Sequence, residues 1–276
     1  MKKLLIAAIA WCGAMSSQAQ DTTATEKVDT IHVGGMIILK KQGKDKEEKD
    51  GGDKEIIIST HNKKKPSNLS TNWWIMDFGF SNINENTNYS SAEAQAFAPG
   101  FTKEQLKLKT GKSVNVNIWF FMQRLNLIKH VVNLKYGLGL ELNNYHFENE
   151  TVRLSTSPTI ITLDPALQNV GKNKLAADYI TVPMMLNFNL TPKQDKGFGF
   201  SAGISAGFLY DARQKVKADE KNKVHDDFDL NQWKLSYVGE LNLGPVRLYG
   251  SYAIESMWEK GLDQMPYNVG IRFSSW

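Results

Sequence analysis

One run of residues matches a catalytic motif, because Gly203-Ile204-Ser205-Ala206-Gly207 has the G-x-S-x-G pattern. In α/β-hydrolases this pattern forms a sharp turn between a strand and a helix, and the turn exposes the serine as a nucleophile. Here the run lies inside an unbroken stretch of alternating small and apolar residues, and no helical pattern follows it. We therefore interpret its glycines as small residues on one face of a β-strand.

Other catalytic and metal-binding patterns are weak in this chain. The histidines lack a metal-ligand spacing such as H-x-x-x-H; they are His32, His61, His130, His146 and His225. Asp226, Asp227 and Asp229 follow His225 in a polar stretch that has the composition of a solvated loop. Cys12, the single cysteine, lies in a stretch that we predict to be removed as a signal peptide. We expect a protein that is not an enzyme and binds no metal or cofactor.

Charged residues inside the alternating stretches form the most informative cluster. If these stretches close into a barrel, six of them face its interior as a structural charge network: Asp77, Lys135, Glu141, Glu240, Arg247 and Arg272. Antiparallel pairing of the first and last strands would bring Asp77 and Arg272 to the same depth, so we predict an ion pair across the closure. Glu240 and Arg247 flank a Gly244-Pro245 turn, close enough for a diagonal contact. A buried charge without a partner costs several kcal/mol, so pairing is expected.

The elements that would position these charges are eight segments with the period of a β-strand. They span residues 73–83, 113–123, 132–142, 179–190, 198–211, 233–243, 246–255 and 267–273. In the first segment, Trp74, Met76, Phe78 and Phe80 alternate with small or charged residues. Pro183 interrupts the fourth segment, where a proline would normally indicate an edge strand. A closed barrel has no edge, so we expect a local bulge at Pro183.

The connections between the eight segments alternate between long and short. Residues 124–129, residues 191–197 and Gly244-Pro245 are short, whereas residues 147–177 and 212–232 are long. Outer-membrane barrels show this alternation, with long loops outside and tight turns in the periplasm. The fold class is therefore all-β: an eight-stranded antiparallel up-and-down transmembrane β-barrel at residues 72–276. An even number of strands places both barrel termini in the periplasm.

Two observations favour a membrane barrel over a soluble periplasmic one, which remains an alternative. The polar face of the strands is rich in Gly, Ser and Asn and carries charges, as a wet lumen requires. Aromatic residues lie near strand ends, as in interfacial girdles. Those predicted to face the periplasmic interface are Trp73, Trp74, Tyr267 and Phe273, and those predicted at the outer interface are Trp233 and Trp258. Outside the N-terminus no apolar run reaches the roughly 18 residues of a membrane helix.

The N-terminal quarter of the chain has a different composition. Lys2, Lys3, an apolar run and Ser17-Gln18-Ala19 indicate a signal peptide at residues 1–19. Residues 20–71 then form a charged periplasmic segment, in which residues 40–54 cannot bury a core. The flanking residues 31–39 and 55–60 could pair as a small hairpin. The net charge of +4 is too small to indicate nucleic-acid binding.

The barrel resembles the PorT-like outer-membrane β-barrel family (OMP_b-brl type). The resemblance is carried by four runs in this sequence: WWIMDFGF from Trp73, KYGLGLE from Lys135, YITVP from Tyr179 and YNVGIRF from Tyr267. It covers residues 73–276 and implies an outer-membrane location. It also implies a role as an accessory in protein secretion or envelope assembly. The last strand resembles the signal that the barrel-assembly machinery reads during insertion.

We therefore expect an outer-membrane β-barrel with a structural or interaction role. Its partners would be outer-membrane lipid, the barrel-assembly machinery during insertion, and a secretion or envelope protein. A narrow passive pore for small solutes is one alternative, although eight strands leave a lumen that side chains fill. An outer-membrane hydrolase acting through the acidic loop near His225 is another.

Overall fold

The computed structural model describes residues 28–33, 36–41, 67–192, 197–217 and 221–274. The chain divides into two compact units, Met1–Pro66 and Ser67–Trp276, and each is described by itself. The predicted signal peptide at residues 1–19 lies outside the described residues. The second unit begins five residues before the predicted boundary at residue 72, because the first barrel strand already starts at Leu69.

The first unit contains a two-stranded antiparallel hairpin. Its strands are β1 (Val28–Val33) and β2 (Met36–Lys41), with Val33 paired to Met36. We had expected residues 31–39 to form one arm of a hairpin and to pair with residues 55–60. This prediction is wrong for residues 31–39, because they contain parts of both β1 and β2, which pair with each other. Gly34 and Gly35 separate the arms in the sequence, and Gly-Gly is a favoured two-residue hairpin connection. Residues 55–60 lie outside the described part of the chain.

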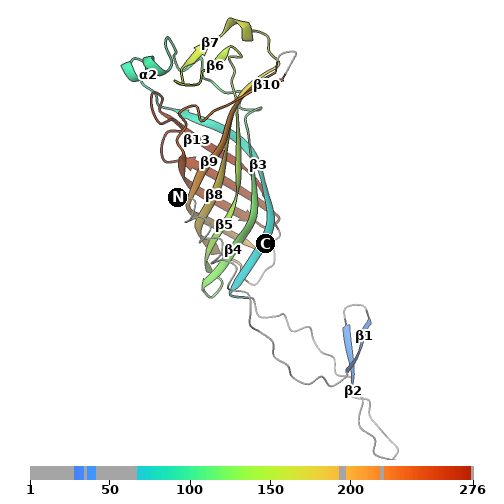
Figure 1. Ribbon diagram of the computed structural model, residues 1–276. Helices are drawn as coiled ribbons and strands as arrows, with labels where there is room; N and C mark the ends of the chain where they lie inside the picture. The colour runs from blue at the N-terminus through green and yellow to red at the C-terminus, as the bar shows by residue number, and fades with distance from the viewer. Residues whose placement is uncertain (1–27, 34–35, 42–66, 193–196, 218–220, 275–276) are drawn as a thin grey trace, which may run out of the picture. The chain divides into compact units, whose positions relative to one another are not determined.

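The second unit is a closed ring of eight antiparallel strands (Figure 1). Each strand pairs with the next along the chain, and the last pairs with the first, which confirms the predicted up-and-down barrel. The strands are β3 (Leu69–Glu85), β4 (Val114–Ile128), β5 (Val132–His146), β8 (Lys172–Asn189), β9 (Phe198–Lys217), β11 (Trp233–Leu243), β12 (Val246–Ala253) and β13 (Gln264–Phe273).

Several strands are longer than their apolar alternation indicated. β8 begins at Lys172, seven residues before the predicted start, and β9 continues to Lys217, six residues past the predicted end. The two extensions pair with each other from Lys172 opposite Lys217. Most of their outward-facing residues are charged, so backbone pairing continues where the apolar outer face has stopped.

The predicted bulge at Pro183 is wrong. Pro183 lies opposite Ser205 in an unbroken register with β9, and the register between β5 and β8 is the same on both sides of it. Register shifts lie elsewhere, at Phe120 and between Asn126 and Ile128 in β4, and between Asp178 and Tyr179 in β8. The closed sheet accommodates the missing N–H by leaving a gap in the β5–β8 pairing rather than by adding a residue.

The outward-facing side chains form an apolar belt around the barrel. Among its exposed members are Met76, Phe78, Phe80, Ile180, Val182, Met184, Leu186, Phe200, Ile204, Leu235, Leu241, Val269 and Ile271. On β8 the belt runs from Ile180 to Leu190, just past the strand end. At about 3.3 Å per residue and a strand tilt of about 40°, these residues span about 25 Å, the height of the lipid-facing band of outer-membrane barrels.

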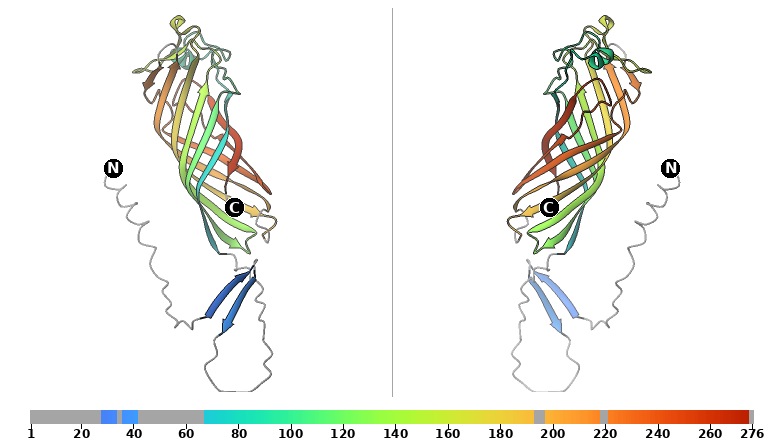
Figure 2. Two further views of the ribbon diagram at one scale, coloured as in Figure 1. Left: turned by 90° about the vertical axis from the view of Figure 1, so that its right-hand side faces the viewer. Right: turned by 90° about the vertical axis from the view of Figure 1, so that its left-hand side faces the viewer.

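The long connections gather at one end of the barrel, called here the loop end, and the short ones at the other, called the turn end (Figures 1 and 2). The loop end carries α2 (Ala92–Phe97), β6 (Val152–Leu154), β7 (Ile161–Leu163), the 3-10 turn η1 (Pro165–Leu167) and β10 (Lys221–His225). Together these elements and their connections form the loop cap. In the described ranges, no helix is long and apolar enough to cross a membrane.

Candidate functional site

The pair predicted across the barrel closure is present. Asp77 on β3 and Arg272 on β13 are directly opposite in register. Arg272 donates from Nε to Oδ1 and from Nη2 to Oδ2, each at 2.7 Å. Asp77 is fully buried and also accepts from Trp119 Nε1 at 2.7 Å and from Asn117 Nδ2 at 3.1 Å. One carboxylate therefore joins β3, β4 and β13 where the chain closes on itself.

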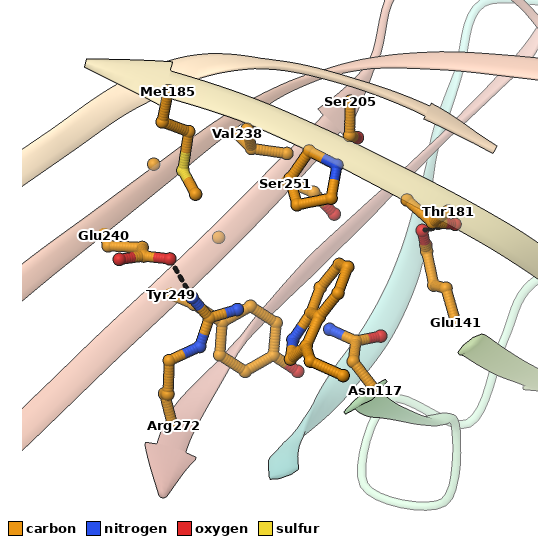
Figure 3. A pocket seen from close by; sticks show the side chains of 14 residues that line it. Asn117, Glu141, Thr181, Met185, Ser205, Val238, Glu240, Tyr249, Ser251 and Arg272 are labelled. Carbon is orange, nitrogen blue, oxygen red and sulfur yellow. Dashed lines mark hydrogen bonds and ion pairs between the residues drawn. The ribbon is translucent and has the colours of Figure 1, made fainter. Parts of the chain in front are cut away.

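Glu240 on β11 extends this pair across the lumen. It accepts a hydrogen bond from Arg272 Nη1 (Figure 3) and another from Lys135 Nζ on β5. Asp77, Arg272, Glu240 and Lys135 thus form a continuous chain of opposite charges from β3 to β5. All four side chains are buried, so their charges are compensated by one another rather than by water.

Glu141 is the centre of a second cluster, nearer the loop end. It pairs with Lys234 on β11 and accepts from Asn143 Nδ2 and Asn268 Nδ2, each at 3.1 Å. Lys234 was not among the predicted lumen charges. The alternation of β11 carries the signal, because Lys234, Ser236 and Glu240 share one parity. With Lys234 included, the lumen network holds three carboxylates and three cations.

Arg247 does not join this network. Its guanidinium donates to the backbone oxygen and, at 2.6 Å, to the hydroxyl of Ser274, instead of reaching Glu240. The predicted diagonal contact is wrong because Glu240 points into the lumen toward Arg272, whereas Arg247 lies beside the end of β13.

Small residues make room for the large side chains of the lumen. A Cβ on Gly79 would lie 2.5 Å from the Tyr249 hydroxyl, and one on Gly270 would lie 2.7 Å from the Tyr249 ring. A cavity of about 30 Å³ remains between Tyr249, Arg272 and their neighbours (Figure 3). That volume corresponds to about one water molecule. The lumen at this level is therefore filled.

The predicted interfacial aromatics divide into two groups. Trp73, Trp74, Trp233 and Phe273 are exposed on the outer wall, with Trp73 and Trp74 near the turn end and Trp233 near the loop end. Trp258 is a correction, since it is 4% exposed inside the loop cap, 5.4 Å from the Phe97 ring, and donates to Gln264. Tyr267 faces outward but pairs with Asn82, toward the loop end rather than the periplasmic interface. β13 runs from the loop end at Gln264 to the turn end at Phe273, so Tyr267, near its start, lies in the loop-end half of the strand.

The loop cap has an apolar core of its own that sequence patterns did not reveal. It is formed by residues from the long connections and from the loop-end parts of β5, β8 and β9: Phe97, Phe101, Leu106, Leu108, Tyr145, Phe147, Val152, Leu154, Ile161, Leu175, Tyr179, Phe228, Leu230, Met257, Trp258 and Leu262. Burial, with the Glu85 carboxylate, also raises the pKa of Tyr89 at the edge of this core. These side chains close the loop end of the barrel.

The residues that could support catalysis lie in separate parts of the barrel. Ser205 of the G-x-S-x-G run lies in the middle of β9, buried in the lumen, and no helix follows it there. His225 Nδ1 lies 2.9 Å from Asp211 Oδ1 on the outer wall. In the part of the chain that the structure describes, no group of three His, Cys, Asp or Glu side chains could hold a metal ion.

Comparison with known proteins identifies the barrel. A search of curated proteins found no match to this chain. A family model described as an outer membrane protein beta-barrel domain matches residues 75–254, more than half of the 276 residues. The matched range contains most of the eight-stranded ring and the charged lumen. The chain therefore belongs to the outer membrane protein beta-barrel domain family.

Proposed function

We propose that this protein is a non-enzymatic interaction barrel of the outer membrane, accessory to protein secretion or envelope assembly. Its loop end faces outside, and its barrel termini and the charged segment at residues 20–66 lie in the periplasm. The accessory role follows the resemblance of the barrel to PorT-like proteins. In this proposal the lumen is a structural core and the two ends of the molecule make the contacts.

The filled lumen is the observation that carries this proposal. A passive pore needs a continuous water path, whereas here Arg272 bridges Asp77 and Glu240 across the interior. The cavity beside them holds about 30 Å³, and the loop cap covers the loop end with a packed apolar core. An eight-stranded barrel with these contents supports interaction at its surfaces better than conduction.

The orientation is supported by connection lengths. β3 starts and β13 ends at the turn end, where the short connections lie, while the loop cap occupies the opposite end. Long loops of outer-membrane barrels face outward. The segment preceding β3 would then emerge into the periplasm, where secretion and assembly components are found.

Photocrosslinking in intact cells of the native organism tests the accessory role. A photoreactive residue at Thr60, in the segment preceding the barrel, is compared with the same residue at Met184 in the apolar belt. We expect secretion or assembly proteins to be enriched at Thr60 over Met184. Equal profiles at the two positions would contradict the accessory role, because Met184 reports only lipid and abundant neighbours. A third probe at exposed Leu163 tests for a partner at the loop cap.

A further inference from the structure

Five lysines form a compact cationic surface on the outer wall at the loop end, called here the rim lysine patch. They lie on neighbouring extensions of β8, β9 and β10: Lys172, Lys174, Lys215, Lys217 and Lys223. All five share the outward parity of their strands, because Gln214 and Asn173, one residue away, point to the buried inner side. Lys217 and Lys223 are exposed and Lys172 and Lys215 are half-buried, whereas Lys174 is only 8% exposed and donates to Asn144 Oδ1. Figure 1 shows β10 beside the loop-end part of the barrel.

The register places these like charges directly opposite one another. Lys172 pairs with Lys217, Lys174 with Lys215, and Lys223 also with Lys215. Like charges in facing positions of a sheet repel and destabilise it. A multivalent anion that bridged the three strands would relieve this repulsion and stabilise the sheet.

The carboxylates beside the patch are already engaged. Asp178 and Asp211 both accept from Arg213, with Asp178 at 2.5 Å. Among the described residues, no carboxylate lies within 4.0 Å of any of the five lysine ammonium groups. Five lysines and Arg213 against Asp178 and Asp211 give a net charge of +4, so this surface is cationic.

The patch lies at a defined height above the apolar belt. Ile180 is the uppermost exposed belt residue on β8, and Lys174 is six residues closer to the loop end. With the rise and tilt used for the belt, Lys174 stands about 15 Å beyond the belt edge. The headgroup layer of an ordinary phospholipid bilayer is only about 5–8 Å thick per leaflet. Phosphates carried on the sugars of a glycolipid extend farther from the hydrocarbon than phospholipid phosphates do.

We propose that the rim lysine patch binds the sugar-borne phosphates of an outer-leaflet glycolipid whose acyl chains pack on the apolar belt below. Clustered lysines next to a membrane surface bind anionic lipid headgroups electrostatically. The continuous wall from Ile180 to Lys174 lets one lipid contact both surfaces, which a free phosphate could not do. This inference rests on the proposed orientation, with the loop end in the outer leaflet.

Lipid binding by the purified full chain in detergent micelles tests this inference, because it depends neither on orientation in the cell nor on a protein partner. Native mass spectrometry measures retention of a rough-type lipopolysaccharide with phosphorylated inner sugars. The same lipopolysaccharide after enzymatic dephosphorylation, phosphatidylglycerol, and inorganic phosphate serve as comparison probes. The variant is Lys172→Gln/Lys215→Gln/Lys217→Gln/Lys223→Gln. Its matched control is Lys103→Gln/Lys107→Gln/Lys129→Gln/Lys260→Gln, which removes the same charge from exposed lysines elsewhere.

We expect the wild-type and control proteins to retain the phosphorylated glycolipid, and the patch variant to bind it about tenfold more weakly or worse. Dephosphorylation should weaken binding to wild type to a similar extent. Equal retention of the phosphorylated and dephosphorylated lipids by wild type would overturn the inference without recourse to any variant. Preference for phosphatidylglycerol, or inorganic phosphate displacing the lipid at matched phosphate concentration, would overturn it too. Loss of binding in the control variant would show that total charge, not the patch, is responsible.

Discussion

The interior of this protein is filled in two different ways along its length. In the barrel, charged side chains from four strands neutralise one another, with Arg272 between Asp77 and Glu240. At the loop end, aromatic and aliphatic side chains from connections far apart in sequence pack around Trp258 and Phe228. The charged interior of the barrel stabilises the fold mainly by pairing charges that would be costly to bury alone. The interior of the loop cap stabilises the fold by burying apolar area.

This difference predicts different responses to damage. Removing one charge from the lumen leaves its partners buried without compensation inside a closed ring, so the whole barrel is affected. Removing one aromatic side chain from the cap creates a void in a core that is built mainly from the long connections, so opening can be local. The contrast supports a barrel that is a stable support and a cap that is the adaptable surface.

The largest expected effect is that of Arg272→Ala. It leaves the Asp77 and Glu240 carboxylates without their shared cation in a buried site, and breaking such a pair costs about 3–5 kcal/mol. Urea unfolding of the barrel in lipid vesicles, followed by tryptophan fluorescence, measures the loss. A change below about 1 kcal/mol would mean that water reaches these carboxylates, and the closed lumen would have to be abandoned.

Trp258→Ala should produce a loss of similar size that is confined to the cap. Truncating a buried tryptophan costs about 3 kcal/mol or more, and this ring packs on Phe97 and donates to Gln264. We expect faster proteolytic cleavage in the loop cap and an unchanged urea midpoint for the barrel. If the urea midpoint of the barrel fell as well, the barrel and the loop cap would unfold as one cooperative unit.

The barrel ring and the cap differed in how far the sequence could predict them. Period-two alternation and antiparallel closure fix depth and face together, so Asp77 and Arg272 could be paired from their positions alone. The same alternation predicts that Lys234 faces the lumen, because it shares the parity of Glu240 on β11. Trp258 could not be placed, because a long connection has no period and its aromatic rings can face a core or an interface. The extensions of β8 and β9 were not predicted because charged residues replace apolar ones on their outer face, and backbone pairing leaves no signal of its own in the sequence.

Gly270→Ala should cost about 1–3 kcal/mol, the range of overpacking in a filled interior. A Cβ there would lie 2.3 Å from the Phe78 carbonyl oxygen and 2.7 Å from the Tyr249 ring. Gly250→Ala is the matched control on the lipid-facing side, where the nearest atom would be 3.5 Å away. Urea unfolding of both variants is compared. Equal stabilities would indicate that the lumen has more room than its packing implies.

The smallest expected effect is that of Arg153→Ala in the cap. Arg153 Nε lies 2.6 Å from Asp164 Oδ2, but the arginine side chain is 46% exposed. Exposed pairs contribute about 0–1 kcal/mol, so proteolysis of the cap and unfolding of the barrel should both stay close to wild type. Placed beside Arg272→Ala, this variant separates the effect of burial from that of losing an arginine–aspartate pair. A loss matching that of Arg272→Ala would remove the distinction between the two regions.

Single-channel recording of the full chain in planar bilayers tests the closed lumen most directly. We expect no stable conductance steps for the wild-type protein, because the Asp77–Arg272–Glu240 bridge spans the lumen and the loop cap covers its loop end. Reproducible ohmic steps from wild type would contradict it and make a passive pore the better description of this barrel.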